Sequence, residues 1–167
     1  MKVNVIVCGP AVGKTYLAEH DVRFVDLDRE RAIYKYNLYG CSERELEAGK
    51  LNRGKVAAHD SKEFVIRRLN EEIEKGKCVL LSRDEFYINY LQENNIPYCL
   101  VYPGKDLAPE YAQRMKKRGN CDKFIRESAN SEVWEKFYEE HRNDNKPTIK
   151  IELKAGQYLS DVIDIII

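Results

Sequence analysis

A glycine-bearing turn near the beginning of the chain carries a lysine and a threonine that suit phosphate chemistry. The segment from Cys8 to Thr15 matches the pattern G-x-x-x-x-G-K-[ST] at its last three defined positions, with Cys8 in place of the first glycine. Backbone N–H groups of such a loop point at an anion. In this arrangement Lys14 contacts the β- and γ-phosphates and acts in catalysis, while Thr15 ligates Mg²⁺. The residues predicted to hold the phosphates of ATP are Gly9, Pro10, Ala11, Val12, Gly13, Lys14 and Thr15.

Two carboxylates follow the second apolar segment of the chain. Asp26 and Asp28 stand two residues apart at the end of a predicted strand, so both point the same way if the strand continues. At the carboxyl end of a parallel strand they face the ligand crevice. We assign Asp26 to the metal and Asp28 to the acceptor, as a catalytic group that takes a proton from, or orients, the attacking hydroxyl or phosphate. The alternative is that Asp28 caps the next helix and Asp26 is a solvated strand end.

Cations occur at two further places that suit an anionic substrate. Arg114 and Arg118 are one turn apart on a predicted helix, where they can close together onto phosphates and serve as catalytic residues. For the neighbouring Lys116 and Lys117, a solvated basic face is an equally good interpretation. Arg83 follows the third predicted strand and either binds the acceptor phosphate or forms an ion pair nearby.

The hydrophobic pattern places these residues on alternating strands and helices. Apolar, β-branched segments predict strands, and segments with apolar residues three and four apart predict helices. The alternation indicates an α/β domain with a parallel sheet, and no repeat or linker divides residues 1–167. The predicted strands are 3–8, 23–27, 78–81, 97–102 and 148–153, and the predicted helices are 14–20, 29–39, 42–49, 59–75, 84–93, 107–118, 122–141 and 157–166.

Composition limits the partners of such a domain. The 28 Lys and Arg residues balance the 28 Asp and Glu residues, so a small anionic ligand fits better than a long polyanion. The five cysteines form no C-x-x-C pair, and their odd number favours reduced thiols in a cytosol. The first apolar run is too short for a signal peptide or a membrane span. We therefore expect a cytoplasmic protein without a membrane partner, and the sequence indicates no oligomeric state.

Several short segments also resemble a known group of proteins. Together with the N-terminal loop they cover most of the chain, and they resemble P-loop kinases of the nucleoside monophosphate kinase type, in particular small nucleotide kinases of bacteriophages. The resemblance implies a three-layer P-loop NTPase fold with a central five-stranded parallel sheet, ATP and Mg²⁺, and a helical lid at about 105–130 that carries Arg114 and Arg118. It also implies the host cytoplasm as the location if the protein is phage-encoded. The segments are 96–103, Glu110-Tyr111, Arg114, Arg118-Gly119-Asn120, Phe124-Ile125 and Trp134.

The acidic pair is similar to that of shikimate and polynucleotide kinases, where it serves the metal and the acceptor. The leading interpretation is ATP- and Mg²⁺-dependent phosphoryl transfer to a nucleoside or deoxynucleoside monophosphate, a small-molecule acceptor. One alternative is a kinase of a hydroxyl on a polynucleotide end or a modified DNA base, with Asp28 as general base. Another is a regulator that binds ATP without transferring phosphate.

Overall fold

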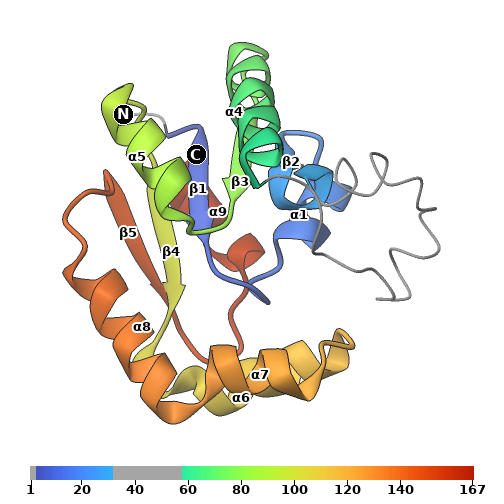
Figure 1. Ribbon diagram of the computed structural model, residues 1–167, viewed down its shortest axis with the longest axis vertical. Coiled ribbons are helices and arrows are strands. Elements are labelled where there is room, and N and C mark those ends of the chain that lie inside the picture. Colours follow the sequence, from blue (N-terminus) through green and yellow to red (C-terminus); the bar gives the residue numbers. More distant parts are fainter. Residues whose placement is uncertain (1–2, 32–57) are drawn as a thin grey trace.

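A computed structural model describes residues 3–31 and 58–167 of the chain (Figure 1). The predicted helix 42–49 and most of the predicted helix 29–39 lie outside these residues. None of the helices in the described part is long and apolar enough to cross a membrane.

Five strands form one parallel sheet in the order β2-β3-β1-β4-β5. The strands are β1 (Val5–Cys8), β2 (Phe24–Asp26), β3 (Cys78–Leu81), β4 (Cys99–Pro103) and β5 (Ile149–Leu153). All residues of β1, β3 and β4 are buried, as expected for continuous apolar strands that are covered on both faces. The α/β class and the five-stranded parallel sheet are therefore confirmed.

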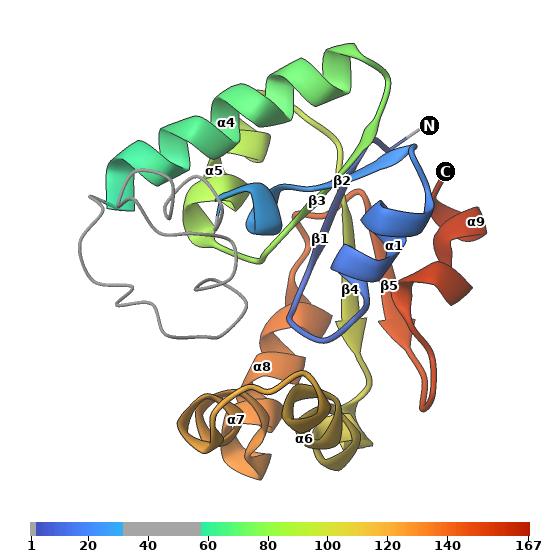
Figure 2. The ribbon, with the colours of Figure 1, turned by 90° about the vertical axis from the view of Figure 1, so that its right-hand side faces the viewer.

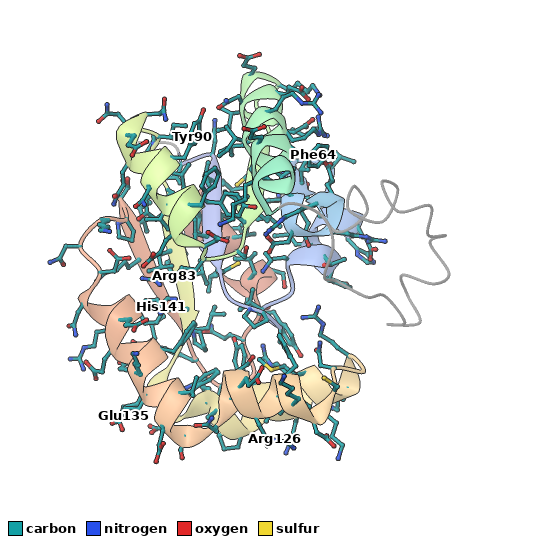
Figure 3. All side chains as sticks on the ribbon, in the orientation of Figure 1. Phe64, Arg83, Tyr90, Arg126, Glu135 and His141 are labelled. Atoms are coloured by element: carbon teal, nitrogen blue, oxygen red, sulfur yellow. The ribbon has the colours of Figure 1, made fainter. Side chains whose placement is uncertain are left out.

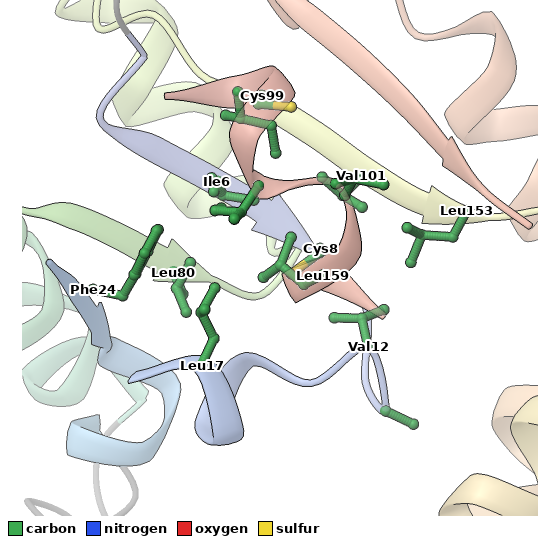
Figure 4. Packing of buried hydrophobic residues seen from close by; sticks show 14 of the residues in the cluster. Ile6, Cys8, Val12, Leu17, Phe24, Leu80, Cys99, Val101, Leu153 and Leu159 are labelled. Atoms are coloured by element: carbon green, nitrogen blue, oxygen red, sulfur yellow. The ribbon is translucent and has the colours of Figure 1, made fainter. Parts of the chain in front are cut away.

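Helices cover both faces of this sheet, because alternate residues of each strand point to opposite sides. On one face Ile6 and Cys8 pack with Leu17 of α1 (Lys14–His20) and with the C-terminal segment, η2 (Leu159–Asp161) and α9 (Ile163–Ile166). On the other face Val5 and Val7 join the core under α4 (Ala58–Glu74) and α5 (Glu85–Glu93). Figure 2 shows the two layers of helices on either side of the sheet, and Figure 4 shows the first core around Cys8.

The predicted lid segment, residues 105–130, contains η1 (Lys105–Leu107), α6 (Ala108–Lys117) and α7 (Asp122–Ala129). It lies beyond the carboxyl ends of the strands, and α8 (Ser131–Asn143) leads from it back along the sheet (Figure 1). Pro109 occupies the first turn of α6, where its missing N–H leaves no helix bond unmade.

Three predicted elements differ from the structure. The single helix predicted at 122–141 is two helices, because Asn130 has extended backbone angles and its side chain accepts a hydrogen bond from Val133 N at the start of α8. The closing helix predicted at 157–166 is reduced to η2 and α9, which begin after a reciprocal cap between Tyr158 and Asp161. The second strand ends at Asp26 and residues 27–31 are helical, so Asp28 belongs to a helix.

Candidate functional site

A wide pocket lies at the carboxyl end of β1. It has a volume of about 1190 Å³ and is lined by residues 10–16, by Asp26 and Asp28, and by residues of α6 and α7. In the sheet order the chain leaves β1 toward β2 on one side and leaves the adjacent β4 toward β5 on the other, so the connections diverge between β1 and β4. Ligands of open α/β sheets bind at such a divergence, outside the carboxyl ends of the strands.

The loop that enters this pocket adopts a shape that explains its residue types. Gly13 has a φ of 98°, a left-handed conformation that favours glycine. A Cβ atom built there would be in ordinary van der Waals contact with the Tyr158 ring, at 3.4 Å. Ala11 also has a positive φ, of 61°. Cys8 is still part of β1, and its side chain is fully buried in the core. A side chain is therefore accommodated where the sequence pattern has its first glycine.

Lys14 turns back over the loop and has three oxygen atoms around its ammonium group. Its Nζ donates to Gly9 O at 3.0 Å and Cys8 O at 3.4 Å, and it lies 3.2 Å from Asp28 Oδ2. Burial on its own lowers the pKa of the Lys14 ammonium, but the surrounding acidic groups more than offset it, and the pKa is raised. Lys14 is therefore a fixed positive charge at the pocket floor.

Thr15 and Asp26 form an adjacent pair of oxygen groups. The Thr15 hydroxyl donates to Asp26 Oδ2 at 2.8 Å, and Asp26 Oδ1 accepts from Arg29 N at 3.2 Å. Burial raises the pKa of the Asp26 carboxyl, against the lowering effects of the Thr15 hydrogen bond and of Lys14. Asp26, and not Asp28, thus caps the following helix.

These two groups suit Mg²⁺ in donor type, because Mg²⁺ prefers oxygen ligands and keeps several waters or substrate phosphates. No group of three or more His, Cys, Asp or Glu side chains that could hold a metal occurs in ranges 3–31 and 58–167. A magnesium ion held by Thr15 and Asp26 would therefore need phosphate or water oxygens to complete its coordination.

Asp28 joins three elements at the pocket floor. Its Oδ1 accepts from Ser82 N, just after β3, at 3.1 Å, and its Oδ2 contacts Lys14 at the end of the loop. The side chain remains 27% exposed, so one edge of the carboxylate faces the pocket. The structure thus brings Lys14, Thr15, Asp26 and Asp28 together as the sequence analysis expected, although a helical turn and not strand alternation places Asp28. Ser82 had no sequence signal beyond its position after a strand.

Arg114 is part of a network between α6, the loop and the segment after β5. Its guanidinium pairs with Glu110, donates to Gln157 O at 2.9 Å and to Ala11 O at 3.4 Å, and lies 3.8 Å from the ring centre of Tyr158. The Glu110 carboxylate also accepts from Gly156 N. Only 8% of the Arg114 side chain is exposed, so although it lines the pocket, its guanidinium is held by protein groups. Gly156 and Tyr158, which line the pocket through this network, had no sequence indication, and Glu110 entered only as part of the resemblance, without a role.

Arg118 behaves differently from Arg114, although both line the same pocket. It ends α6, it is exposed, and no ion pair is found for it within the described part of the chain. Lys117 is exposed beside it and also lines the pocket. Within the predicted lid segment, these two residues are the exposed cations that line the pocket.

The structure does not bring Arg83 into this pocket. Its Nη2 lies 3.5 Å from Asp144 Oδ2, at the C-terminal end of α8. Figure 3 shows Arg83 close to His141, on the side of α5 and α8. Because the side chain is held there, Ser82 and not Arg83 reaches the pocket edge from β3.

Neither a scan against protein-family models nor a search of curated proteins finds a match to this chain.

Proposed function

We propose that the chain is a P-loop kinase that uses ATP and Mg²⁺ to phosphorylate a nucleoside or deoxynucleoside monophosphate. The observation that carries this proposal is the ammonium of Lys14, held over the loop by Gly9 O and Cys8 O beside two carboxylates at one sheet edge. A lysine folded back over a backbone loop is the arrangement that cradles a β,γ-phosphate pair.

The residues present fit both ATP and Mg²⁺. The loop has two consecutive bends at Ala11 and Gly13 that turn its backbone around an open space, and Lys14 supplies a permanent charge there. Thr15 and Asp26 would hold the metal, which neutralises charge on the transferred phosphoryl group when bound. Arg118 and Lys117 face the same space from the lid and suit the negative charge of the transferred or acceptor phosphate.

A hydroxyl acceptor is the second candidate, and Asp28 favours it. Transfer to a hydroxyl forms one P–O bond, breaks the bond to ADP and releases one proton. Asp28 is held by Ser82 N with one edge toward the pocket, in a position to take that proton. A phosphate acceptor is already ionised and needs no such base, so Asp28 would then serve to orient it or Lys14.

The test is ADP release from Mg-ATP across nucleoside monophosphates, deoxynucleoside monophosphates and DNA with free 5′ hydroxyls or modified bases. Stimulation by a monophosphate supports the first acceptor class, and stimulation only by hydroxyl acceptors supports the second. If ATP binds but no acceptor in the panel stimulates ADP release, the kinase proposal fails and the regulator interpretation replaces it.

The Asp28→Asn variant distinguishes the two acceptor classes further. With a hydroxyl acceptor, we expect kcat to fall by about 10²-fold or more while ATP affinity changes little, because general-base catalysis contributes about 10²–10⁴-fold. With a monophosphate acceptor, the loss of kcat should be smaller and the KM of the acceptor should change as well. A matched Asp84→Asn variant removes a carboxylate that caps α5 outside the pocket and is the control.

A further inference from the structure

A second, smaller pocket lies beside the beginning of the phosphate loop. Its volume is about 220 Å³, and it shares Pro10 and Ser128 with the larger pocket, so the two spaces adjoin. Most of its wall is aromatic or apolar, from α6 and from the first turns of α8. The residues that matter below are Gly9, Pro10, Tyr111, Val133, Trp134 and Phe137.

The chemistry of this wall suits a planar ring and not a phosphate. None of the described residues that line the pocket is a lysine or an arginine, and Glu127 adds a negative charge at its edge. Trp134 lies 5.1 Å from the Tyr111 ring and 5.8 Å from the Phe137 ring, centre to centre, so the three rings pack together in the wall, with Trp134 3% and Tyr111 1% exposed. Aromatic surfaces of this kind bind rings by stacking or edge contacts. The volume far exceeds the share of about 30 Å³ that one water occupies.

Gly9 lies in the wall of this pocket, next to Phe137. A Cβ atom built on Gly9 would lie 3.4 Å from Phe137 Cζ, which shows how closely the loop backbone approaches the aromatic wall. The absence of a side chain leaves the backbone of Gly9 at the boundary between the two spaces. A ring in the smaller pocket would therefore lie next to the phosphate loop.

The order of the phosphates along the loop indicates whether a ring bound in the smaller pocket belongs to ATP or to the acceptor. Lys14, which contacts the β- and γ-phosphates in loops of this type, has its Nζ 3.0 Å from Gly9 O. The start of the loop is therefore the γ-phosphate end, and the rest of ATP extends toward Thr15 and α1. A ring beside Gly9 and Pro10 lies on the acceptor side of the phosphoryl group.

We infer that this aromatic pocket binds the nucleobase of the phosphoryl acceptor. The inference rests on the proposed kinase function and narrows it, because an acceptor without an aromatic base would leave the pocket unused. A free mononucleotide and a base within DNA share this chemistry, and separate arms of the experiment distinguish them.

Trp134 gives a direct test, since it is the only tryptophan in the chain. We would record its fluorescence with saturating Mg-ADP and then add a deoxynucleoside monophosphate, a short oligonucleotide or, as control, ribose 5-phosphate. A saturable change with one of the first two, and none with ribose 5-phosphate, is expected. An unchanged signal with an acceptor that stimulates ADP release would overturn the inference and leave the kinase proposal intact. A saturable change without ADP release from any acceptor would instead support the base pocket and contradict the kinase proposal.

A rim substitution tests the same pocket through kinetics. Val133 is 40% exposed at the pocket, so Val133→Phe should place a ring in it without disturbing the core. We expect the KM of the acceptor to rise about tenfold, in the range of pocket contacts of this size, while the KM of ATP stays within about twofold. Val22→Phe, at a position that is 85% exposed and outside the pocket, is the matched control. Equal acceptor KM values in the two variants would contradict the inference.

Discussion

Lys14 and Arg118 face one pocket from opposite sides, and the chain holds them in different ways. The Lys14 side chain is 11% exposed and has three oxygens within 3.4 Å of its Nζ, whereas Arg118 ends a helix in solvent. The loop side is therefore formed before a ligand arrives, whereas the cations at the end of α6 are exposed and form no ion pair in the part of the chain that the structure describes. Preformed groups lower the reorganisation needed at the moment of reaction, and groups on a lid complete a site when the lid closes.

Two arginines on one face of α6 also differ in whether protein groups hold their side chains. Arg114 and Arg118 have the spacing of a pair, yet Arg114 binds Glu110 and two backbone carbonyls while Arg118 makes no ion pair in the described ranges. Residues one turn apart share a helix face, but the elements opposite each of them decide what they contact. We therefore expect their substitutions to affect different quantities.

Lys14→Ala should have the largest effect, because it removes the fixed charge of the preformed side. We expect kcat/KM for ATP to fall by about 10³-fold, the upper range for loss of one stabilising group in a site of this kind. ADP release measures it, and circular dichroism checks that the fold persists. Lys117→Ala is the control from the exposed side and should lose far less. A loss below tenfold in Lys14→Ala would refute the assigned phosphate loop.

Arg118→Ala should affect activity and leave stability unchanged. We expect kcat to fall by about 10–10²-fold, since the residue would reach the phosphoryl group only when the lid closes. The midpoint of urea unfolding should stay within error of the parent, because the exposed side chain has little packing to lose. Arg126→Ala, on α7 outside the pocket, is the matched control. Unchanged kcat would show that the lid cation is not used.

Arg114→Ala, in contrast to Arg118→Ala, should mainly reduce the stability of the fold. Removing a buried guanidinium leaves Ala11 O and Gln157 O without their donor, and we expect the free energy of unfolding to fall by roughly 2–3 kcal/mol. Urea unfolding measures this loss. Arg114→Lys keeps the charge but not the planar fork, so it should recover only part of the stability. Stability equal to that of the parent in both variants would contradict the network.

The smallest expected effect is that of His141 on the pH dependence of the free energy of unfolding. Burial lowers the pKa of its imidazole to about 4, near Arg83 and Asp144, from an unfolded value of about 6.5. The unfolded chain therefore binds a proton that the folded chain does not, and stability falls as pH drops from 6.5 toward 4, by roughly 1–2 kcal/mol between pH 7 and pH 5. His141→Phe should lose this part of the pH dependence in urea unfolding, whereas the exposed His20→Gln should keep it. An identical pH dependence in both variants would contradict a buried neutral imidazole.

The strands of the sheet and the loop after β1 could be predicted well, because the sequence signals for them are local. Continuous apolar runs such as Val5–Cys8 and Cys78–Leu81 fit buried parallel strands, and the loop between β1 and α1 follows its pattern. The break at Asn130 was missed because the apolar spacing continues across it, while one side-chain cap starts a new helix. Arg83 was misplaced because its partner, Asp144, is 61 positions away in the chain and only packing brings α8 to it. The pocket walls from Gly156 and Tyr158 depend on such distant contacts and had no local signal, and the contact of Glu110 with Gly156 could not be predicted either.

The left-handed backbone at Ala11 has a consequence for the speed of ligand binding. An alanine with φ of 61° costs on the order of 1 kcal/mol compared with glycine, and the surrounding contacts of the folded chain hold it there. The loop is thus bent before any ligand arrives, and this conformational cost is met at folding. If the proposed function holds, ATP should bind without a slow step in which this loop rearranges, so that any second kinetic phase would come from closure of α6 and α7.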